Sequence, residues 1–152
     1  MTLEEGGALF YPDPDIEGLL MQTERWQDTI AFIAPATCLV LLHVFVEKSL
    51  LALARHLREE GDPLPRQSRG RSKIDSYLDF LRDTRGLEFT EPEEAKLLRR
   101  ATARIRNDFS HGDWDDIRKS ITQINLVEAF RTVSALFQSI EEATWVRNQP
   151  EV

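Results

Sequence analysis

A short segment near the end of a predicted helix carries the residue types that phosphate chemistry needs. Arg106, Asn107 and His111 lie in the sequence Arg-Asn-Asp-Phe-Ser-His-Gly. A guanidinium binds phosphate oxygens through charge-assisted hydrogen bonds, and an imidazole exchanges protons near neutral pH. Two such cations held side by side repel each other. The pattern is therefore a poor structural motif and a good one for holding a phosphate and moving a proton.

The spacing of Arg106 and His111 sets a geometric condition on that chemistry. Five positions separate them, so the two side chains diverge on an unbroken helix that turns by about 100° per residue. They converge only if the helix ends close to His111, where Gly112 offers a stop, or if two chains share the site. On a helical wheel Arg106 lies beside the apolar stripe that contains Ile105 and Phe109, so we expect it to face a groove or a partner.

Four further residues are candidates for supporting this site. His43 and Glu47 are four positions apart on an otherwise apolar segment, so they share one helix face. They form either a buried pair that fixes helix register or the support of a polar site. Ser110 and Trp114 flank the motif, and Trp114 either packs the turn that positions His111 or stacks an RNA base.

The charge distribution points to the middle of the chain as the region that a polyanion would meet. The net charge is -7 over the whole sequence, but it is -6 for residues 1–54, +3 for residues 55–106 and -4 for residues 107–152. The acidic balance argues against a simple nucleic-acid coat. The candidate RNA-binding residues are the central arginines Arg66, Arg69, Arg71, Arg99, Arg100 and Arg104.

Several classes of site are excluded by composition. Cys38 is the single cysteine and the chain has three histidines, too few and too scattered for a zinc finger. The sequence has neither a phosphate-loop glycine pattern nor a GxSxG nucleophile turn. We therefore predict no metal and no cofactor.

One apolar segment is near the lower limit for a membrane span. Residues 29–46 contain no Asp, Glu, Lys or Arg over eighteen positions. Pro35 and His43 interrupt the segment, and the apolar pattern resumes after Glu47. We interpret it as a helix end, a turn marked by Pro35 and a buried second helix, in a cytoplasmic protein with no membrane contact.

The whole chain is predicted to be all-α, with residues 1–14 as an N-terminal arm and residues 15–152 as a single helical domain. We expect an up-and-down bundle of four to five helices. The expected helices cover residues 15–34, 36–60, 73–85, 91–110 and 114–146, and residues 61–72 form a basic loop.

Capping signals and large side chains refine this arrangement. Ser72 is expected to cap the third helix, and Thr90 with Glu93 is expected to form a capping box at the fourth. Asp113 or Asp115 is expected to cap one long last helix. The aromatic residues predicted to lie in the core are Phe32, Phe45, Phe80, Phe109, Phe130 and Phe137, with Trp26 and Trp145 in the core or at an interface.

The motif and the helix order together resemble the HEPN domain family. The resemblance rests on Arg106-Asn107, three spacer residues and His111, placed on the helix before a long final helix. A central apolar helix with an internal acid, Glu47, then a basic loop and a shorter helix precede it, so the resemblance covers roughly residues 15–146.

That resemblance implies a function and a partner. Many HEPN proteins are metal-independent endoribonucleases of toxin–antitoxin and defence systems, and they usually dimerise so that two motifs form one cleft. Here Arg106 would hold the scissile phosphate and His111 would act as general acid or base for attack by the ribose 2′-hydroxyl. Asn107 would orient the pair, and Glu47 is a candidate partner of Arg106. RNA, a second copy of the chain and a nucleotidyltransferase-type antitoxin are the expected partners.

Two other functions fit the same residues. Some HEPN-like domains are non-catalytic binding or assembly modules, in which Arg106 and His111 would serve an interface or bind a nucleotide phosphate. The chain could also be an unrelated helical regulatory partner, in which both are ordinary polar residues at a helix end.

Overall fold

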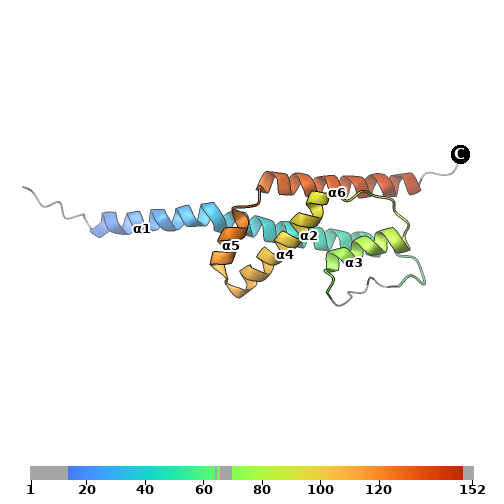
Figure 1. Cartoon of the computed structure of the whole chain (residues 1–152), viewed down its shortest axis with the longest axis horizontal. Helices are drawn as coiled ribbons and strands as arrows, with labels where there is room; N and C mark the ends of the chain where they lie inside the picture. The colour runs from blue at the N-terminus through green and yellow to red at the C-terminus, as the bar shows by residue number, and fades with distance from the viewer. Residues whose placement is uncertain (1–13, 64, 66–69, 149–152) are drawn as a thin grey trace, which may run out of the picture.

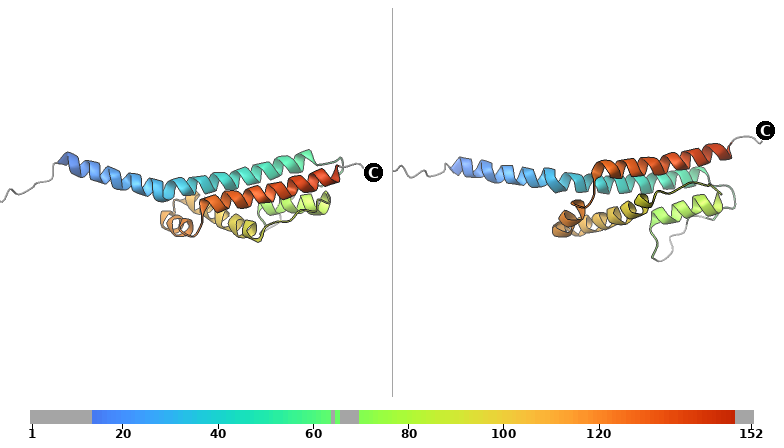
Figure 2. Two further views of the ribbon diagram at one scale, coloured as in Figure 1. Left: turned by 90° about the horizontal axis from the view of Figure 1, so that it is seen from above. Right: turned by 45° about the horizontal axis from the view of Figure 1, so that its top comes forward.

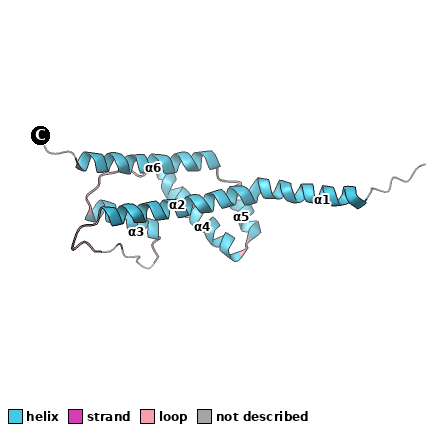
Figure 3. Ribbon diagram, turned by 180° about the vertical axis from the view of Figure 1, so that it is seen from behind, coloured by secondary structure: helices cyan, strands magenta, loops and turns pink. Residues whose placement is uncertain are grey.

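The computed structural model describes residues 14–63, 65 and 70–148, and every regular element in this part of the chain is a helix (Figures 1 and 3). The predicted arm lies outside the described residues except for Pro14. The elements are α1 (Pro14–Asp28), the π-helical turn η1 (Thr29–Ile33), α2 (Ala34–His56), α3 (Lys73–Asp79), the π-helical turn η2 (Phe80–Thr84), α4 (Glu93–His111), α5 (Trp114–Ile121) and α6 (Leu126–Arg147). The all-α prediction is confirmed.

The central helix of the bundle is α2, which contacts α3, α4, α5 and α6. Helix α6 runs beside α2 along most of its length, and α3, α4 and α5 cover another side (Figures 1 and 2). Helix α1 continues the line of α2 and projects beyond the bundle in every view. The motif helix α4 crosses α2 obliquely, so side chains of the two helices meet near the middle of α2.

The prediction of a turn at Pro35 is wrong, because α1, η1 and α2 form one continuous helix. A proline in a regular helix clashes with the carbonyl four residues earlier, here Ala31. The π turn lies directly before Pro35, and the Ala34 N–H bonds to the Thr29 carbonyl. This wider turn accommodates the ring, so the helix continues past it. Helix α2 then ends at His56, earlier than the expected Glu60.

The predicted caps have different outcomes. Ser72 and Asp75 form the expected kind of capping box at α3, with the Ser72 hydroxyl accepting from the Asp75 N–H at 3.1 Å. The capping box predicted from Thr90 and Glu93 is wrong, because α4 begins at Glu93 itself and Pro92 occupies the cap position. The Thr90 N–H instead donates to the Ser139 hydroxyl at 2.9 Å, which ties this connection to α6.

The prediction of a single last helix is also wrong, because the helix ends with α5 at Ile121 and a second helix, α6, begins at Leu126. Asn125 caps α6, with its side-chain oxygen accepting from the Glu128 N–H at 3.2 Å. Asparagine competes with helical backbone hydrogen bonds and so favours this start position. Asn125 followed three positions later by Glu128 was the signal in the sequence.

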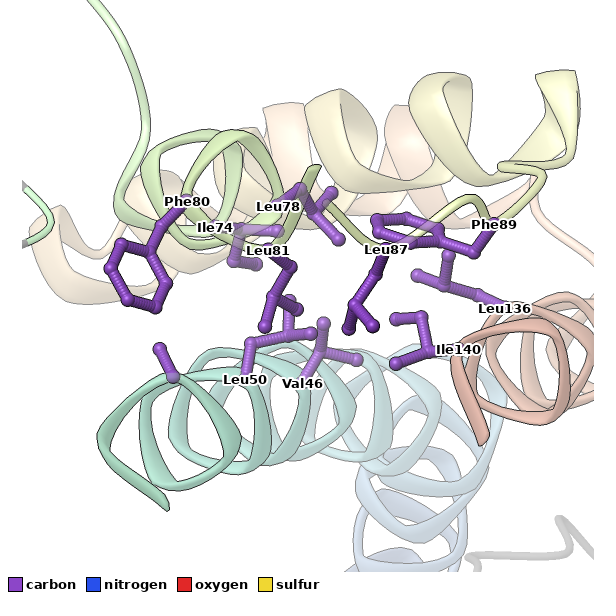
Figure 4. Packing of buried hydrophobic residues seen from close by; sticks show 11 residues of the cluster. Val46, Leu50, Ile74, Leu78, Phe80, Leu81, Leu87, Phe89, Leu136 and Ile140 are labelled. Atoms are coloured by element: carbon purple, nitrogen blue, oxygen red, sulfur yellow. The ribbon is translucent and has the colours of Figure 1, made fainter. Parts of the chain in front are cut away.

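The buried core has two parts. One joins α2, α3, η2 and α6 through the residues Val46, Leu50, Ile74, Leu78, Leu81, Leu136 and Ile140, together with Phe80, Leu87 and Phe89 (Figure 4). The other joins η1, α2, α4 and α5 around Leu39, Ile105 and Ile117. These two parts hold α2 against every other helix of the bundle.

The aromatic residues divide differently from the prediction. Phe32 and Phe80 are buried, and Phe109 and Phe137 pack at the margin of the core. Placing Phe45 and Phe130 in the core was wrong, because both are at least half exposed. The two tryptophans assigned to core or interface, Trp26 and Trp145, are also exposed, at 66% and 69%.

The continuous helix Ile16–His56 is long and apolar enough to cross a membrane by length and composition. The core helix of a soluble protein passes the same test. One face of α2 fills the centre of the bundle with Ala36, Leu39 and Leu42, which is the behaviour of a core helix. Only 33% of the most apolar window is buried, so a large apolar area of the helix faces outward.

Replacing Leu50 by alanine tests the core. Leu50 is fully buried, whereas Leu97 on α4 is 61% exposed. We expect Leu50→Ala to lower the free energy of unfolding by about 2–5 kcal/mol, because it leaves a cavity, and Leu97→Ala to change it by less than about 0.5 kcal/mol. Urea unfolding followed by circular dichroism measures both. Equal midpoints for the two variants would contradict this packing.

Candidate functional site

The centre of the candidate site is a carboxylate on the inner side of α2. The side chain of Glu47 is 11% exposed and lies between two cations. Arg106 on α4 approaches it at 3.5 Å and Lys73 at the start of α3 at 3.4 Å. Both cations remain about half exposed, at 49% and 50%. This ion triplet therefore combines a buried anion with two cations that still face solvent, and it carries a net positive charge.

The structure contains the Arg106–Glu47 contact that was anticipated from their positions in the sequence. A carboxylate removed from water needs a paired cation and hydrogen bonds. Arg106 supplies such a cation to Glu47, so its guanidinium is held against α2. A held guanidinium loses less conformational entropy when it binds an anion. The arrangement is thus suited to binding one phosphate at the outer side of Arg106 and Lys73.

One helical turn before Glu47, His43 is also buried. Its Nδ1 lies 3.0 Å from the Thr102 hydroxyl, one turn before Arg106 on α4. The Thr102 hydroxyl also lies 3.2 Å from the Arg99 carbonyl, so it has hydrogen-bond partners on both helices. His43 and Glu47 are both buried on one side of α2, but each has its own partner on α4, Thr102 for His43 and Arg106 for Glu47.

The environment of His43 disfavours its charged form. Burial lowers the pKa of the imidazole below its ordinary value of 6.5, and the nearby Arg106 lowers it further. Glu47 acts in the opposite direction, and Arg99 adds a smaller lowering effect. The His43 ring is thus neutral at neutral pH, and it supports the site from the inside.

Arg99, a predicted RNA-binding residue, is paired with carboxylates of its own chain. Its side chain is 15% exposed and pairs with Asp75 at 2.8 Å and with Glu91 in a second, closer contact. Arg82 also contacts Glu91, at 3.3 Å. Because carboxylates already occupy its guanidinium, Arg99 joins α4 to α3 and to the connection before α4. Little of the Arg99 guanidinium is therefore left for an RNA phosphate, and its predicted contact with RNA stays a prediction.

The far end of the motif has a different setting. Helix α4 continues through His111 and ends at Gly112, whose φ of 75° is the left-handed conformation that glycine adopts readily. The side chains of Arg106 and His111 are therefore about 140° apart around one regular helix. Among the described residues, no hydrogen bond or ion pair joins them. A single chain brings Arg106 to Glu47 and leaves His111 exposed elsewhere.

The remaining motif residues shape the end of α4. The Ser110 hydroxyl donates to the Asn107 carbonyl at 2.7 Å, while Asn107 itself is exposed. Trp114 packs edge-on against Phe109, with ring centroids 5.4 Å apart. Of the two predictions for Trp114, the structure contains the packing of the turn after His111.

Asp108 stands out within the motif because it is buried. One of its carboxylate oxygens has no hydrogen-bond partner among the described residues. Its nearest cation is Arg104, at 3.8 Å. The Asp108 carbonyl accepts from the Asp113 N–H at 2.9 Å, which closes the turn after α4. Asp108 thus contributes to the helix end rather than to the surface that holds Arg106.

The other predicted RNA-binding arginines are spread over the molecule. Arg66 and Arg69 lie outside the described residues. Arg71 is exposed and pairs with Asp79 at 2.5 Å. Arg100 and Arg104 line an open groove between α4 and the start of α6. The structure therefore brings together Arg106, Glu47 and His43, but it does not join them to these arginines.

Two residues of the site were missed in the sequence. Lys73 follows the Ser72 cap directly and is 26 positions from Glu47, so no local spacing relates them. Thr102 is an inconspicuous residue of α4 until His43 packs on it. The only signals were that Lys73 is the first cation after a cap and that Thr102 is four positions before Arg106.

Next to His43 there is a small cavity of about 30 Å³, lined by His43, Arg99 and Thr102 among apolar residues. This volume suits an ordered water rather than a nucleotide. A substrate would therefore bind on the outer surface of the ion triplet. Among the described residues, no group of three or more His, Cys, Asp or Glu side chains is placed to hold a metal ion.

Comparison with known proteins gives no relative. No protein-family model matches the chain, and no curated protein or solved structure is significantly similar to it. The HEPN resemblance thus rests on the Arg106-to-His111 motif and on the order of the helices.

The lowered pKa of His43 predicts how stability depends on pH. In the unfolded chain the ring takes up a proton near 6.5, whereas in the folded chain it stays neutral to lower pH. Below pH 6.5 the unfolded state therefore binds more protons than the folded state. The contribution of His43 to the free energy of unfolding keeps its full value above pH 6.5 and decreases as the pH falls below 6.5. We expect His43→Gln to have a flatter dependence of unfolding free energy on pH there.

His56, which is exposed at the end of α2, provides the matched control. His56→Gln should keep the wild-type slope in urea unfolding measured at a series of pH values. Loss of the slope in His56→Gln, or its persistence in His43→Gln, would show that His43 is not the titrating group.

Proposed function

We propose that this chain is a HEPN-like, metal-independent endoribonuclease of the toxin or defence type. The observation that carries the proposal is Arg106. It is half exposed, it is held by the buried Glu47, and it lies on the helix whose end displays His111. A guanidinium kept at one position by a buried acid is suited to binding a phosphodiester.

In the proposed reaction the nucleophile belongs to the substrate. Arg106 and Lys73 bind the non-bridging oxygens of the scissile phosphate and stabilise the charge that develops on them. A His111 imidazole accepts the proton of the ribose 2′-hydroxyl, whose oxygen forms a bond to phosphorus. The bond from phosphorus to the 5′-oxygen breaks, and that oxygen leaves with a proton from a second imidazole or from water. The products are a 2′,3′-cyclic phosphate and a 5′-hydroxyl.

The proposal requires two chains. Because Arg106 and His111 point about 140° apart on one helix, the reacting geometry is assembled from Arg106 of one protomer and His111 of another. The end of α4 is acidic, with Asp113, Asp115 and Asp116 after the motif. RNA would therefore approach from the side of Lys73 and Arg106.

A second candidate is a non-catalytic binding module. The observation that favours it is that, among the described residues of one chain, Arg106 and His111 do not contact each other. In that case Arg106 and Lys73 bind a phosphate group without cleaving it, and His111 is an ordinary polar residue at a helix end.

RNA cleavage in excess chelator tests the proposal. We expect the wild type to leave 2′,3′-cyclic phosphate ends, and we expect His111→Ala and Arg106→Ala to reduce cleavage by at least about a hundredfold, since each removes a group used in the transition state. His56→Ala and Arg131→Ala are the matched controls, because both residues are exposed and distant in sequence from the motif. Cleavage that stops in chelator and returns with a metal ion would contradict the mechanism.

Mixing two inactive variants tests whether the site is shared. Dimers assembled from Arg106→Ala and His111→Ala contain one intact copy of each residue. Cleavage above that of either variant alone supports a site made by two chains. No cleavage by the folded wild type, together with phosphate-dependent binding of a nucleotide that Arg106→Ala loses, would establish the binding module instead.

A further inference from the structure

Among the described residues, helix α1 lies along no other helix of its own chain, although Asp28 near its end forms an ion pair with Arg118 of α5 at 3.6 Å. It contacts the adjoining turn η1 and extends beyond the bundle in all views (Figures 1 and 2). Helix α1 and the turn η1 nevertheless carry large apolar side chains that are 46–69% exposed, namely Ile16, Leu19, Leu20, Met21 and Trp26 on α1 and Ile30 on η1. A helix of 15 residues that contains Gly18 is marginal in water on its own. Its apolar side therefore needs a partner.

The apolar side of α1 continues along the outer face of α2. Because the helix is unbroken, positions one turn apart form a single line, which we call the outer stripe. Its members are Ile16, Leu19, Thr23, Trp26, Ile30, Ala34, Thr37, Leu41 and Phe45, and each is exposed. The charged residues of α1, such as Glu17, Glu24 and Asp28, are outside this line. Two copies of the stripe can therefore meet without bringing like charges together.

The polar members of the outer stripe are already satisfied. The Thr23 hydroxyl donates to the Leu19 carbonyl and the Thr37 hydroxyl to the Ile33 carbonyl, each at 2.8 Å. Their hydroxyls thus have partners inside the helix, and burying them leaves no donor unpaired. Such a stripe can be covered at low cost.

From Leu19 to Leu41 the outer stripe is symmetric about Ile30. In an antiparallel pair of identical helices with Ile30 opposite Ile30, Leu19 is opposite Leu41 and Thr23 is opposite Thr37. Trp26 is then opposite Ala34, which places the largest side chain against one of the smallest. A two-fold interface has this property, since residue i contacts residue j and residue j contacts residue i.

A groove lies where the end of such a partner helix would arrive. It runs between α2 and α6 beside Phe45, and its lining combines the apolar Phe130, Val133 and Phe137 with the polar Ser134, Gln138 and Glu141. The rings of Phe45 and Phe137 meet edge-on, 5.8 Å apart. In this register Ile16 of the second copy is opposite Val44 and Leu19 is opposite Leu41, so these two side chains would reach the groove and cover the exposed Phe45.

We propose that the outer stripe is a homodimer interface, in which two copies of this chain pair antiparallel about a two-fold axis at Ile30. The helix α1 of each copy lies along α2 of the other and enters its groove beside α6. This inference does not depend on ribonuclease activity. The interface is separate from the Arg106 side of the composite site proposed above, because Arg106 contacts Glu47 on the buried side of α2 and the outer stripe lies on its exposed side.

Mass measurement by light scattering tests the pairing. We expect the wild type to have at least twice the 17.5 kDa of one chain, and Leu19→Asp and Leu41→Asp each to halve the wild-type mass. Leu97→Asp is the matched control, because Leu97 is as exposed as Leu41 but lies on α4. Circular dichroism checks that the variants stay helical. A monomeric wild type, or a mass unchanged by both aspartates, would overturn the interface.

Cysteine crosslinking tests the antiparallel register. In a Cys38→Ala background, a mixture of Leu19→Cys and Leu41→Cys chains should form a disulfide between the two variants on oxidation. Leu19→Cys alone should not crosslink to itself, whereas a parallel pair would do so and would overturn the proposal. Flotation of the wild type with phosphatidylcholine vesicles, lost in Leu19→Asp, would overturn it too by assigning the stripe to a membrane. His111→Ala should remain associated, so a negative ribonuclease assay leaves this result intact.

Discussion

The burial of Glu47 in an otherwise apolar helix is the constraint on which the arrangement of the bundle depends. A carboxylate in such a position is stable only when cations reach it, and α2 supplies none at that place. Lys73 comes from the start of α3 and Arg106 from α4. Satisfying one acid therefore specifies where two other helices lie against α2. One turn earlier on α2, the His43–Thr102 contact also joins α2 to α4, so the position of α4 along α2 is fixed at two points.

The same constraint separates two parts of the motif. Arg106 is held at the ion triplet, and the regular helix then directs His111 to another side of α4. The functional proposal is consequently a proposal about assembly as well as chemistry. Lys73, rather than the loop arginines, supplies the second cation beside Arg106, and Arg99 is committed to Asp75 and Glu91.

The long helix made of α1, η1 and α2 has two apolar sides with different uses. The inner side of α2 forms the core with α4, α5 and α6, and the outer side remains uncovered within one chain. The π turn before Pro35 allows both sides to continue from α1 into α2. A break at Pro35 would have ended the outer stripe after Ile30 and removed its symmetry. The exposed aromatic residues Trp26, Phe45 and Phe130 all lie on or beside this uncovered surface.

Local periodicity by itself determined the helices, most of their ends and the faces that polar residues share. The spacing of His43 and Glu47, the Ser72 cap and the stop at Gly112 all depend on residues within about one turn of each other, so a single sequence contains the information. Tertiary structure alone decided that Lys73 reaches Glu47, that Arg99 forms ion pairs with two carboxylates and that Phe45 lies outside the core. These outcomes depend on how helices cross, and residues far apart in the chain set that crossing. Pro35 belongs with them, because a regular helix excludes it and only the π turn, packed through Phe32, makes room for its ring.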